Sequence, residues 1–269
     1  MAHTDYEYGG MMAEFWDLLR GDTTTWSDRF FYKEIIAQSG QPVLDVGCGT
    51  GRLLLDFMQD GIDSDGMDNS PEMLDRCRQK AVTLGLEPRL YLQTMETLDL
   101  PRRYRTIIVP SSSFQLVTDP ADAREAMRRF FNHLLPSGVL VMSLMPYHTG
   151  DNHDPVVIGE WSRETVRPDD GATIRRWSRS RIDRINDLEH TEDRYEIIVN
   201  GEIVTAESHS RSPATRIYNQ AQARQLYTEA GFTNLRLTSG FTHEPAKPED
   251  DCFCIWGMRP RESLEMTQK

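Results

Sequence analysis

Short apolar runs alternate with amphipathic segments along the first 145 residues. Residues 27–38 carry Phe and Ile side chains at helical spacing, with Ser27 as a helix N-cap and Gly40 just past the end. Residues 42–46 form an apolar run that is typical of a buried strand. The rest of this region continues the alternation, with helices expected over 52–59, 70–85 and 122–135, and strands expected toward Asp68 and over 89–93, 106–109 and 138–145.

This alternation predicts the class of fold. Strands joined by helices of this length imply right-handed crossovers and a mainly parallel sheet. After a helix over 219–230, residues 234–239 and 252–258 supply two last strands. We therefore expect a doubly wound α/β fold with a mainly parallel seven-stranded sheet. Residues 62–65 are unusually polar for it, because parallel strands are covered on both faces.

The pattern changes after residue 150. Polar and apolar residues then alternate, and Asn200-Gly201 separates two such runs as in a β-hairpin. A second turn is expected at residues 169–171. These signals predict an antiparallel β insertion. The predicted division of the chain is a helical N-terminal cap over 1–40, an α/β domain over 41–150 and 214–260, the insertion over 151–213 and a polar tail over 261–269.

A glycine-rich loop follows the first predicted strand. Residues 45–51 read D-V-G-C-G-T-G, which places three alternating glycines between a strand and a helix. Glycines allow a ligand to approach the backbone closely, and the helix amides add to the site. The spacing differs from the G-x-G-x-x-G of dinucleotide-binding loops and lacks the Gly-Lys-Ser/Thr of phosphate-binding loops. A nucleotide-like ligand of another kind is therefore expected.

This loop resembles the first motif of the class I S-adenosylmethionine-dependent methyltransferases, which have a Rossmann-like fold. The resemblance implies that the loop backbone, at Gly47, Cys48, Gly49 and Gly51, lies against the methionine part of the cofactor. It also implies that Asp45 orients the loop and the amino end of the cofactor.

Asp68 supports the resemblance. This carboxylate is predicted to end the second strand, 21 positions after Gly47, where it can accept hydrogen bonds from two ribose hydroxyls. Asn69 beside it is assigned to the same cofactor site. The alternative is a helix N-terminal charge that only complements the helix dipole.

Two further segments resemble cofactor contacts of the family. Residues 93–98 are similar to the segment that flanks the adenine, where Met95 would pack on the ring. The family commonly has an acid at the position of Thr94, so here Glu96 or a backbone carbonyl would receive the adenine amine. Tyr8 and Trp16 resemble the aromatic lid of the glycine and sugar N-methyltransferase branch, in which aromatic faces attract the sulfonium. Ordinary helix packing is the alternative for each aromatic residue.

The serines at residues 111–113 also resemble the glycine and sugar N-methyltransferase branch, in which the corresponding loop reads N/S-S-F. By that analogy Ser111 flanks the cofactor, and Ser112 or Gln115 faces the acceptor. A cluster of serine turns is the structural alternative.

Four more residues are predicted to bind the methyl acceptor. Tyr147 and His148 close the fifth parallel strand, and Arg216 and Tyr218 precede the helix over 219–230. His148 is a candidate general base, although a lone histidine there is more often a hydrogen-bonded surface residue. Arg216 is a candidate for holding an acceptor carboxylate or phosphate, with a surface ion pair as the equal alternative. The catalytic candidates are His148, Tyr218 and Ser112.

The amino-acid composition disfavours some classes of binding partner. Acidic residues outnumber basic ones by 42 to 30, giving a formal net charge of −12, which repels nucleic acid and anionic membranes. No membrane-spanning segment or secretory signal is visible, so a cytoplasmic protein is expected. No metal site is expected either. The alternating insertion strands suggest a homodimer.

The expected reaction is methyl transfer to a small molecule by in-line displacement at the sulfonium. An amine acceptor is favoured because no convincing general base for a hydroxyl is evident. The alternatives are O- or C-methylation, or a cofactor-binding protein without transferase activity.

Overall fold

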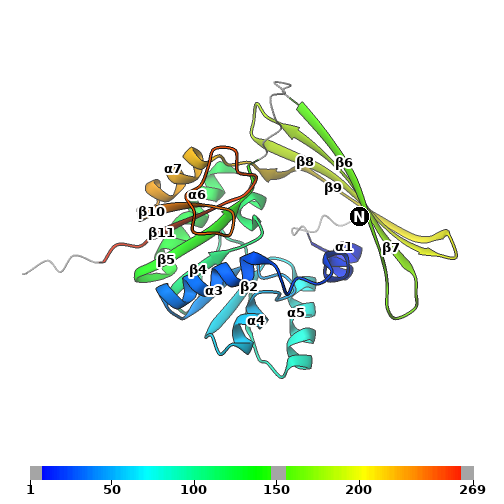
Figure 1. Ribbon diagram of the computed structural model, residues 1–269, viewed down its shortest axis with the longest axis horizontal. Coiled ribbons are helices and arrows are strands. Elements are labelled where there is room, and N and C mark those ends of the chain that lie inside the picture. The colour runs from blue at the N-terminus through cyan, green and yellow to red at the C-terminus, as the bar shows by residue number, and fades with distance from the viewer. Residues whose placement is uncertain (1–7, 147–155, 262–269) are drawn as a thin grey trace, which may run out of the picture.

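A seven-stranded sheet forms the centre of the protein (Figure 1). The computed structural model describes residues 8–146 and 156–261. The strand order is β10-β11-β5-β4-β1-β2-β3, in which the pairs among β1 to β5 are parallel and β11 runs antiparallel to both β5 and β10. The strands are β1 (Val43–Val46), β2 (Ser64–Asp68), β3 (Arg89–Leu92), β4 (Tyr104–Val109), β5 (Leu134–Leu144), β10 (Thr233–Ser239) and β11 (Phe253–Met258). The predicted fold class is confirmed.

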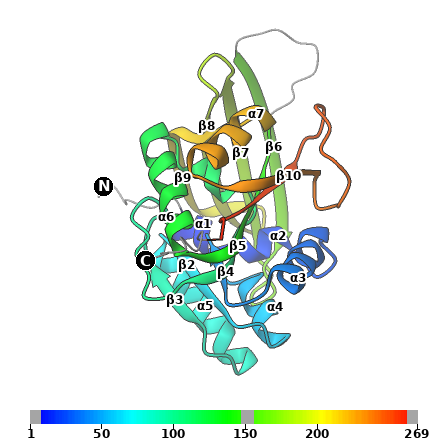
Figure 2. The ribbon, with the colours of Figure 1, turned by 90° about the vertical axis from the view of Figure 1, so that its left-hand side faces the viewer.

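Helices cover both faces of this sheet (Figure 2). Successive strand residues point to opposite faces, so Val43 packs with α3 and α4 while Leu44 packs with α6 and α7. The helix α5 packs with α4 through Leu74 and Leu54. The helices are α3 (Ser27–Ser39), α4 (Leu54–Gln59), α5 (Pro71–Leu84), α6 (Pro120–His133) and α7 (Gln220–Glu229), and a short 3-10 helix, η1, spans Ser113–Leu116.

The helix α6 differs from its predicted bounds of 122–135. Asp119 is its N-cap and accepts hydrogen bonds from two amides of the first turn, with Pro120 at the first helical position. At the other end the predicted extent was wrong, because Leu134 already pairs with Tyr104 as the start of β5.

The polar strand β2 is buried along its whole length, and Asp65 is fully buried. Its carboxylate is neutralised by partners: Arg89 Nε donates at 2.7 Å, Arg102 Nη1 at 3.2 Å, and the Tyr104 hydroxyl at 2.9 Å. Hydrogen bonds and opposite charges compensate for the desolvation of a buried carboxylate. This network explains how so polar a segment forms a strand inside a parallel sheet.

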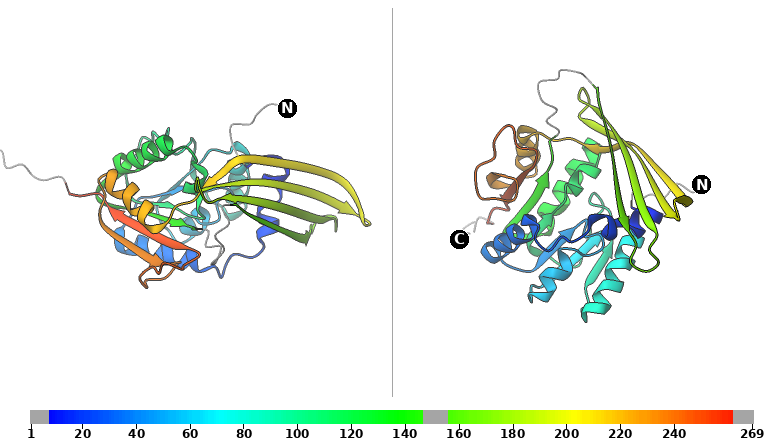
Figure 3. Two further views of the ribbon diagram at one scale, coloured as in Figure 1. Left: turned by 90° about the horizontal axis from the view of Figure 1, so that it is seen from above. Right: turned by 45° about the vertical axis from the view of Figure 1, so that its right-hand side comes forward.

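A second, four-stranded antiparallel sheet projects from the α/β body and is strongly curved (Figure 3). This insertion sheet consists of β6 (Val156–Val166), β7 (Thr173–Asp183), β8 (Leu188–Val199) and β9 (Glu202–Arg216), in that order. The turn at Asn200-Gly201 has positive φ at both residues, as its sequence requires. The predicted antiparallel insertion is confirmed, and its last strand, β9, continues to Arg216, beyond residue 213, where the insertion was predicted to end. The exact domain boundaries stay predictions.

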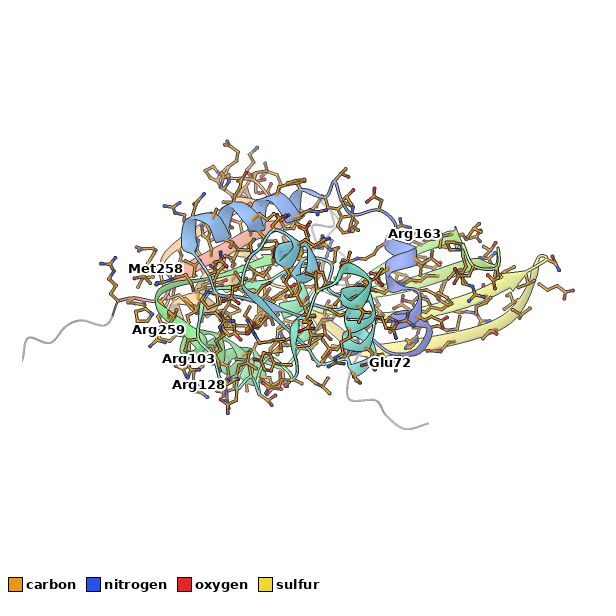
Figure 4. All side chains as sticks on the ribbon, turned by 90° about the horizontal axis from the view of Figure 1, so that it is seen from below. Glu72, Arg103, Arg128, Arg163, Met258 and Arg259 are labelled. Carbon is orange, nitrogen blue, oxygen red and sulfur yellow. The ribbon has the colours of Figure 1, made fainter. Side chains whose placement is uncertain are left out.

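Two short helices, α1 (Gly10–Glu14) and α2 (Trp16–Arg20), lie between the two sheets. Together with Tyr8 they are called the lid below. Their apolar side chains, including Met11 and Phe15, pack against Ile174 and Tyr195 of the insertion sheet. Arg163 of β6 donates to the Arg20 carbonyl and Glu72 of α5 accepts from the Gly10 amide, so the lid is held from two sides (Figure 4).

None of the helices in the described ranges combines the length and the apolar character needed to cross a membrane.

Candidate functional site

A cavity of about 310 Å³ lies at the carboxyl ends of β1, β2 and β4, with the lid on its other side. Open parallel sheets bind ligands at this edge. The cavity is called the cofactor cavity below. Twelve of the thirteen residues predicted to bind the cofactor line it: Tyr8, Trp16, Asp45, Gly47, Cys48, Gly49, Asp68, Asn69, Thr94, Met95, Glu96 and Ser111.

The glycine loop (residues 47–51) turns sharply between β1 and α4. Its three glycines have φ values of +70° (Gly47), +55° (Gly49) and +85° (Gly51), which L side chains rarely adopt. A Cβ at Gly47 would lie 2.9 Å from the side chain of Ser113, whereas one at Gly49 would meet no atom within 4 Å. The loop therefore presents open backbone to the cavity at Gly49.

Gly51 is the predicted cofactor residue that does not line the cavity. A Cβ there would lie 2.6 Å from the Cys77 sulfur and 2.9 Å from the Leu55 side chain. Gly51 therefore lies behind the loop, where α4 packs against α5.

Asp45 supplies a carboxylate without a full set of partners. The residue is 1 % exposed, lines the cavity, and its Oδ1 has no hydrogen-bond partner among the described residues. Burial raises the pKa of Asp45 to about 7, an effect that the Arg52 guanidinium opposes and the Asp68 carboxylate reinforces. A cationic ligand group beside this oxygen would satisfy it and favour its charged form.

Asp68 ends β2 and holds the glycine loop. Its Oδ2 accepts from the Gly49 amide at 2.8 Å and its Oδ1 from the Ser70 amide at 2.9 Å. Burial raises the pKa of Asp68, and these backbone hydrogen bonds oppose the rise. Each carboxylate oxygen can accept a further hydrogen bond, so Asp68 keeps the capacity to bind two hydroxyls of a ligand.

The segment after β3 forms another part of the wall. Thr94, Met95 and Glu96 all line the cavity, and Met95 is 8 % exposed. The Thr94 hydroxyl is 2.8 Å from that of Thr97. The arrangement offers a thioether surface on which a flat ring can pack.

Aromatic residues of the lid close the cavity from the other side. The Tyr8 and Trp16 rings meet edge to face, with centroids 4.7 Å apart. Arg20, which sequence reasoning missed, also lines the cavity. Its guanidinium carbon lies 4.7 Å from the Trp16 ring centroid and 5.4 Å from that of Trp26, and its Nη2 is 3.4 Å from Ser111 Oγ.

Arg20 forms no ion pair with a carboxylate of the described residues, and burial lowers its pKa. A partly buried guanidinium without an ion-pair partner favours an anionic ligand. The W-x-x-x-R spacing on a short helix was the available signal, since it places both side chains on one face.

The serine loop (residues 111–113) forms the wall after β4. Ser111 and Ser112 have φ values of +56° and +58°, and two consecutive non-glycine residues in this region indicate strain at a functional site. Ser111 lines the cavity. Ser112 does not, and its buried Oγ has no hydrogen-bond partner among the described residues.

The predicted acceptor residues are not gathered in the cofactor cavity. Gln115 is 2 % exposed, and its side-chain amide bonds the backbone of Met145 and Arg216. Arg216 donates to the Thr118 carbonyl at 2.7 Å, and Tyr218 packs against Phe114 with its pKa raised to about 12 by burial. Tyr147 and His148 lie outside the described residues. The roles predicted for these residues stay predictions.

Comparison with known proteins bears on the same region. Residues 43–138 match the family of methyltransferase domains. The chain is 25 % identical over 232 residues to dTDP-3-amino-3,6-dideoxy-alpha-D-glucopyranose N,N-dimethyltransferase of Streptomyces fradiae, over 84 % of this chain and 86 % of that protein. It is 28 % identical over 157 residues to glycine/sarcosine N-methyltransferase of Halorhodospira halochloris, over 54 % of this chain and 56 % of that protein.

Solved structures share the fold. The CcbJ methyltransferase from Streptomyces caelestis superposes with a TM-score of 0.76 at 19 % identity, over 97 % of this chain and 100 % of that one. A sugar N-methyltransferase from Streptoalloteichus sp ATCC 53650 superposes with a TM-score of 0.72 at 20 % identity, over 97 % of both chains.

The fold, the glycine loop and the matched domain define a nucleotide-cofactor enzyme of the methyltransferase class. As the glycine loop predicted, the chain resembles the class I S-adenosylmethionine-dependent methyltransferases, and residues 43–138 match a methyltransferase domain. The cavity fits the cofactor, because Asp45 offers an unsatisfied carboxylate oxygen and Gly49 leaves open space beside the backbone.

Proposed function

We propose that the protein transfers the methyl group of S-adenosylmethionine to the amine nitrogen of a small molecule. The observation that carries the proposal is the wall after β4, where serines face the cavity. No histidine or lysine among the described residues lines this cavity. An amine in its free-base form needs no proton acceptor to attack, whereas a hydroxyl does. The named relatives that methylate glycine, sarcosine or an amino sugar give further support.

We assign the cofactor contacts from the geometry above. Asp45 would bind the ammonium group of the cofactor and Arg20 its carboxylate, since Asp45 is a buried carboxylate, Arg20 is a partly buried guanidinium, and both line the cavity. Asp68 accepts from the ribose hydroxyls, and Met95 packs on the adenine. The bound cofactor supplies an electrophilic methyl group on a positively charged sulfur.

The residues of this chain then act by orientation. The lid, with Trp16 and Tyr8, excludes water and covers the sulfonium side of the cavity. The strained serine loop holds Ser111 at the place where the acceptor enters. An amine held there would take the methyl group through its nitrogen lone pair, the electron pair of the carbon–sulfur bond would leave on sulfur, and the product ammonium would give its proton to water.

A panel of acceptors tests this proposal. Purified protein is incubated with S-adenosylmethionine and small amines, alcohols, phenols and carbon acids, and S-adenosylhomocysteine formation is measured by liquid chromatography. We expect turnover among the amines, rising with pH as the free base becomes available. Turnover confined to alcohols or carbon acids would overturn the assignment to nitrogen.

We also propose a homodimer through the insertion sheet. Its two edge strands, β6 and β9, carry half-exposed apolar side chains, among them Trp161 (46 %), Ile158 (54 %) and Ile203 (50 %). Exposed apolar edges favour association with another copy. Sedimentation velocity of the wild type and of Ile158→Glu tests this: we expect a dimer that the charge dissociates, and a wild-type monomer at micromolar concentration would refute it.

A further inference from the structure

A second cavity of about 440 Å³ adjoins the cofactor cavity. Arg20 and Ser111 line both, so the two spaces meet at the serine loop. The other residues that line it are Trp26, Ser27, Asp28, Ser143, Met145 and Phe241.

The second cavity lies at the carboxyl ends of the parallel strands, the edge at which open α/β sheets bind their ligands. Ser111 follows β4, while Ser143 and Met145 stand at the end of the neighbouring parallel strand β5. Trp26 comes from the start of α3 and Phe241 from the connection between β10 and β11. A molecule in this space therefore reaches Ser111 from the side opposite to the adenine segment after β3.

Two polar side chains of the second cavity, Asp28 and Ser143, already have partners. Both oxygens of Asp28 are held by the Arg52 guanidinium, one of them at 3.1 Å from Nη1. Ser143 Oγ accepts from the Ser112 amide at 3.3 Å. An ion pair that satisfies itself offers little to a polar ligand, so these groups do not recruit one.

The apolar surfaces, in contrast, are partly open, although the guanidinium carbons of Arg20 and Arg52 lie 5.4 Å and 5.1 Å from the centroid of the Trp26 ring. Trp26 is 37 % exposed and Met145 is 48 % exposed, although both face a cavity. Burying such surface against an apolar ligand is favourable by about 25 cal/mol per Å². Arg20, at the junction with the cofactor cavity, forms no ion pair with a carboxylate of the described residues.

We infer that the second cavity binds an apolar, aromatic part of the acceptor and so selects the acceptor. The inference rests on the proposed function, because the ring would hold an attached amine at Ser111 beside the cofactor. The recognised class is an arylalkylamine, in which one or two carbons separate the ring from the nitrogen. Trp26 and Met145 are then specificity-determining residues.

Calorimetry with benzylamine and ethanolamine tests this inference. Protein saturated with S-adenosylhomocysteine is titrated with each amine, in the wild type, in Trp26→Ala and in Met145→Asp. We expect benzylamine to bind the wild type at least tenfold more tightly than ethanolamine, and to lose at least fivefold in both variants. Phe30→Ala is the matched control, because Phe30 is an exposed aromatic on α3 that lines neither cavity.

The outcomes separate the inference from the proposed function. Equal benzylamine affinity in the wild type and both variants, or no preference for the ring, overturns the second cavity as the acceptor site, even if other amines are methylated. Ring-dependent binding without any amine turnover in the acceptor panel overturns the proposed function instead. Affinity for S-adenosylhomocysteine, measured in each variant first, shows that the cofactor cavity is intact.

Discussion

At the scale of single residues, the proposed contact of Asp45 with the cofactor ammonium predicts that cofactor binding depends on pH. Its pKa is raised from the ordinary 3.8 to about 7 by burial, with Arg52, Asp68 and Asp28 as its charged neighbours. An ammonium beside the carboxylate favours the charged form, so binding releases a proton at pH values below 7. We expect the Kd for S-adenosylhomocysteine to rise as the pH falls from 7 to 5, approaching tenfold per pH unit. Calorimetry across this range measures it.

Asp45→Asn is the control for this pH dependence. The variant should bind the cofactor product weakly at all pH values, with a flat profile. Because folding raises the pKa of Asp45, the free energy of unfolding of the cofactor-free protein falls as pH rises from about 4 to about 7. The uncharged variant should therefore have a higher Tm than the wild type at pH 8. An unchanged slope in the variant would assign the titration to another group.

Asp68 carries a second residue-scale prediction. Asp68→Asn keeps the size of the side chain but removes the charge that strengthens hydrogen bonds from ribose hydroxyls and from the amides of Gly49 and Ser70. Such bonds contribute roughly 1.5–3 kcal/mol, so the Kd for S-adenosylhomocysteine should rise by about 10- to 100-fold. Isothermal titration measures this, and circular dichroism checks the fold. Unaltered affinity would remove Asp68 from the ribose site.

At the scale of elements, three side chains fasten the lid to the glycine loop. The Thr50 hydroxyl donates to Asp17 Oδ1 at 2.7 Å, Lys80 Nζ donates to Thr50 Oγ1 at 3.0 Å, and Lys80 forms an ion pair with Asp17 at 2.6 Å. Asp17 belongs to α2, which also carries Trp16 and Arg20, and Lys80 belongs to α5. The network therefore sets where the lid residues stand over the cavity.

Lys80→Met tests this network, because Lys80 itself lies outside the cofactor cavity. We expect the Kd for S-adenosylhomocysteine to rise by roughly two- to fivefold, the effect of losing one charged contact at a partly exposed pair. Once an acceptor is known, kcat at saturating cofactor should change less than KM. Lys33→Met, which removes a lysine ion-paired with Asp56 and Asp60 away from the lid, is the matched control. Equal losses in both variants would mean that the effect is general.

The elements themselves were predictable from local signals. Ser70 and Pro71 begin α5 as expected, and Ser70 Oγ accepts from the Met73 amide. The start of α6 was missed although Asp119 and Pro120 carry the same kind of signal. The end of β9 could not be predicted, because its last residues are held by pairing with Leu188 and Glu189 of β8, a contact that the local pattern does not contain.

The residues at the strand-end side of the cofactor cavity were predictable in the same way, since the glycine loop and Asp68 directly follow predicted strands in the sequence. Arg20 and the second cavity were not, because they depend on tertiary contacts. Arg20 acquires its place from Trp16, Trp26 and Ser111, which come from three parts of the chain. Gln115 was expected near the site, as a residue that faces the acceptor. In the structure its side-chain amide instead donates to the Met145 and Arg216 carbonyls and so joins the ends of β5 and β9.

At the scale of the whole molecule, the lid couples the two sheets. One face of the lid lines the cofactor cavity with Trp16, and the other packs on the insertion sheet through Met11, Phe15 and Leu19. Ile174 of β7 and Tyr195 of β8 receive these side chains and are 0 % and 1 % exposed. The insertion sheet is therefore a support for the cofactor cavity, even though it lies mostly outside it.

This coupling predicts an effect at a distance. Ile174→Ala removes apolar contacts that hold the lid but alters no residue of the cofactor cavity. Truncating a buried isoleucine costs about 2–5 kcal/mol, part of which should appear as weaker ordering of the lid. We expect the Kd for S-adenosylhomocysteine to rise by about fivefold or more, together with faster amide exchange in α1 and α2. Ile182→Ala, a buried isoleucine of the same strand outside this cluster, should lower Tm without changing the Kd. If both variants lose the same affinity, general destabilisation explains the loss; if Ile174→Ala alone does, the insertion sheet positions the lid.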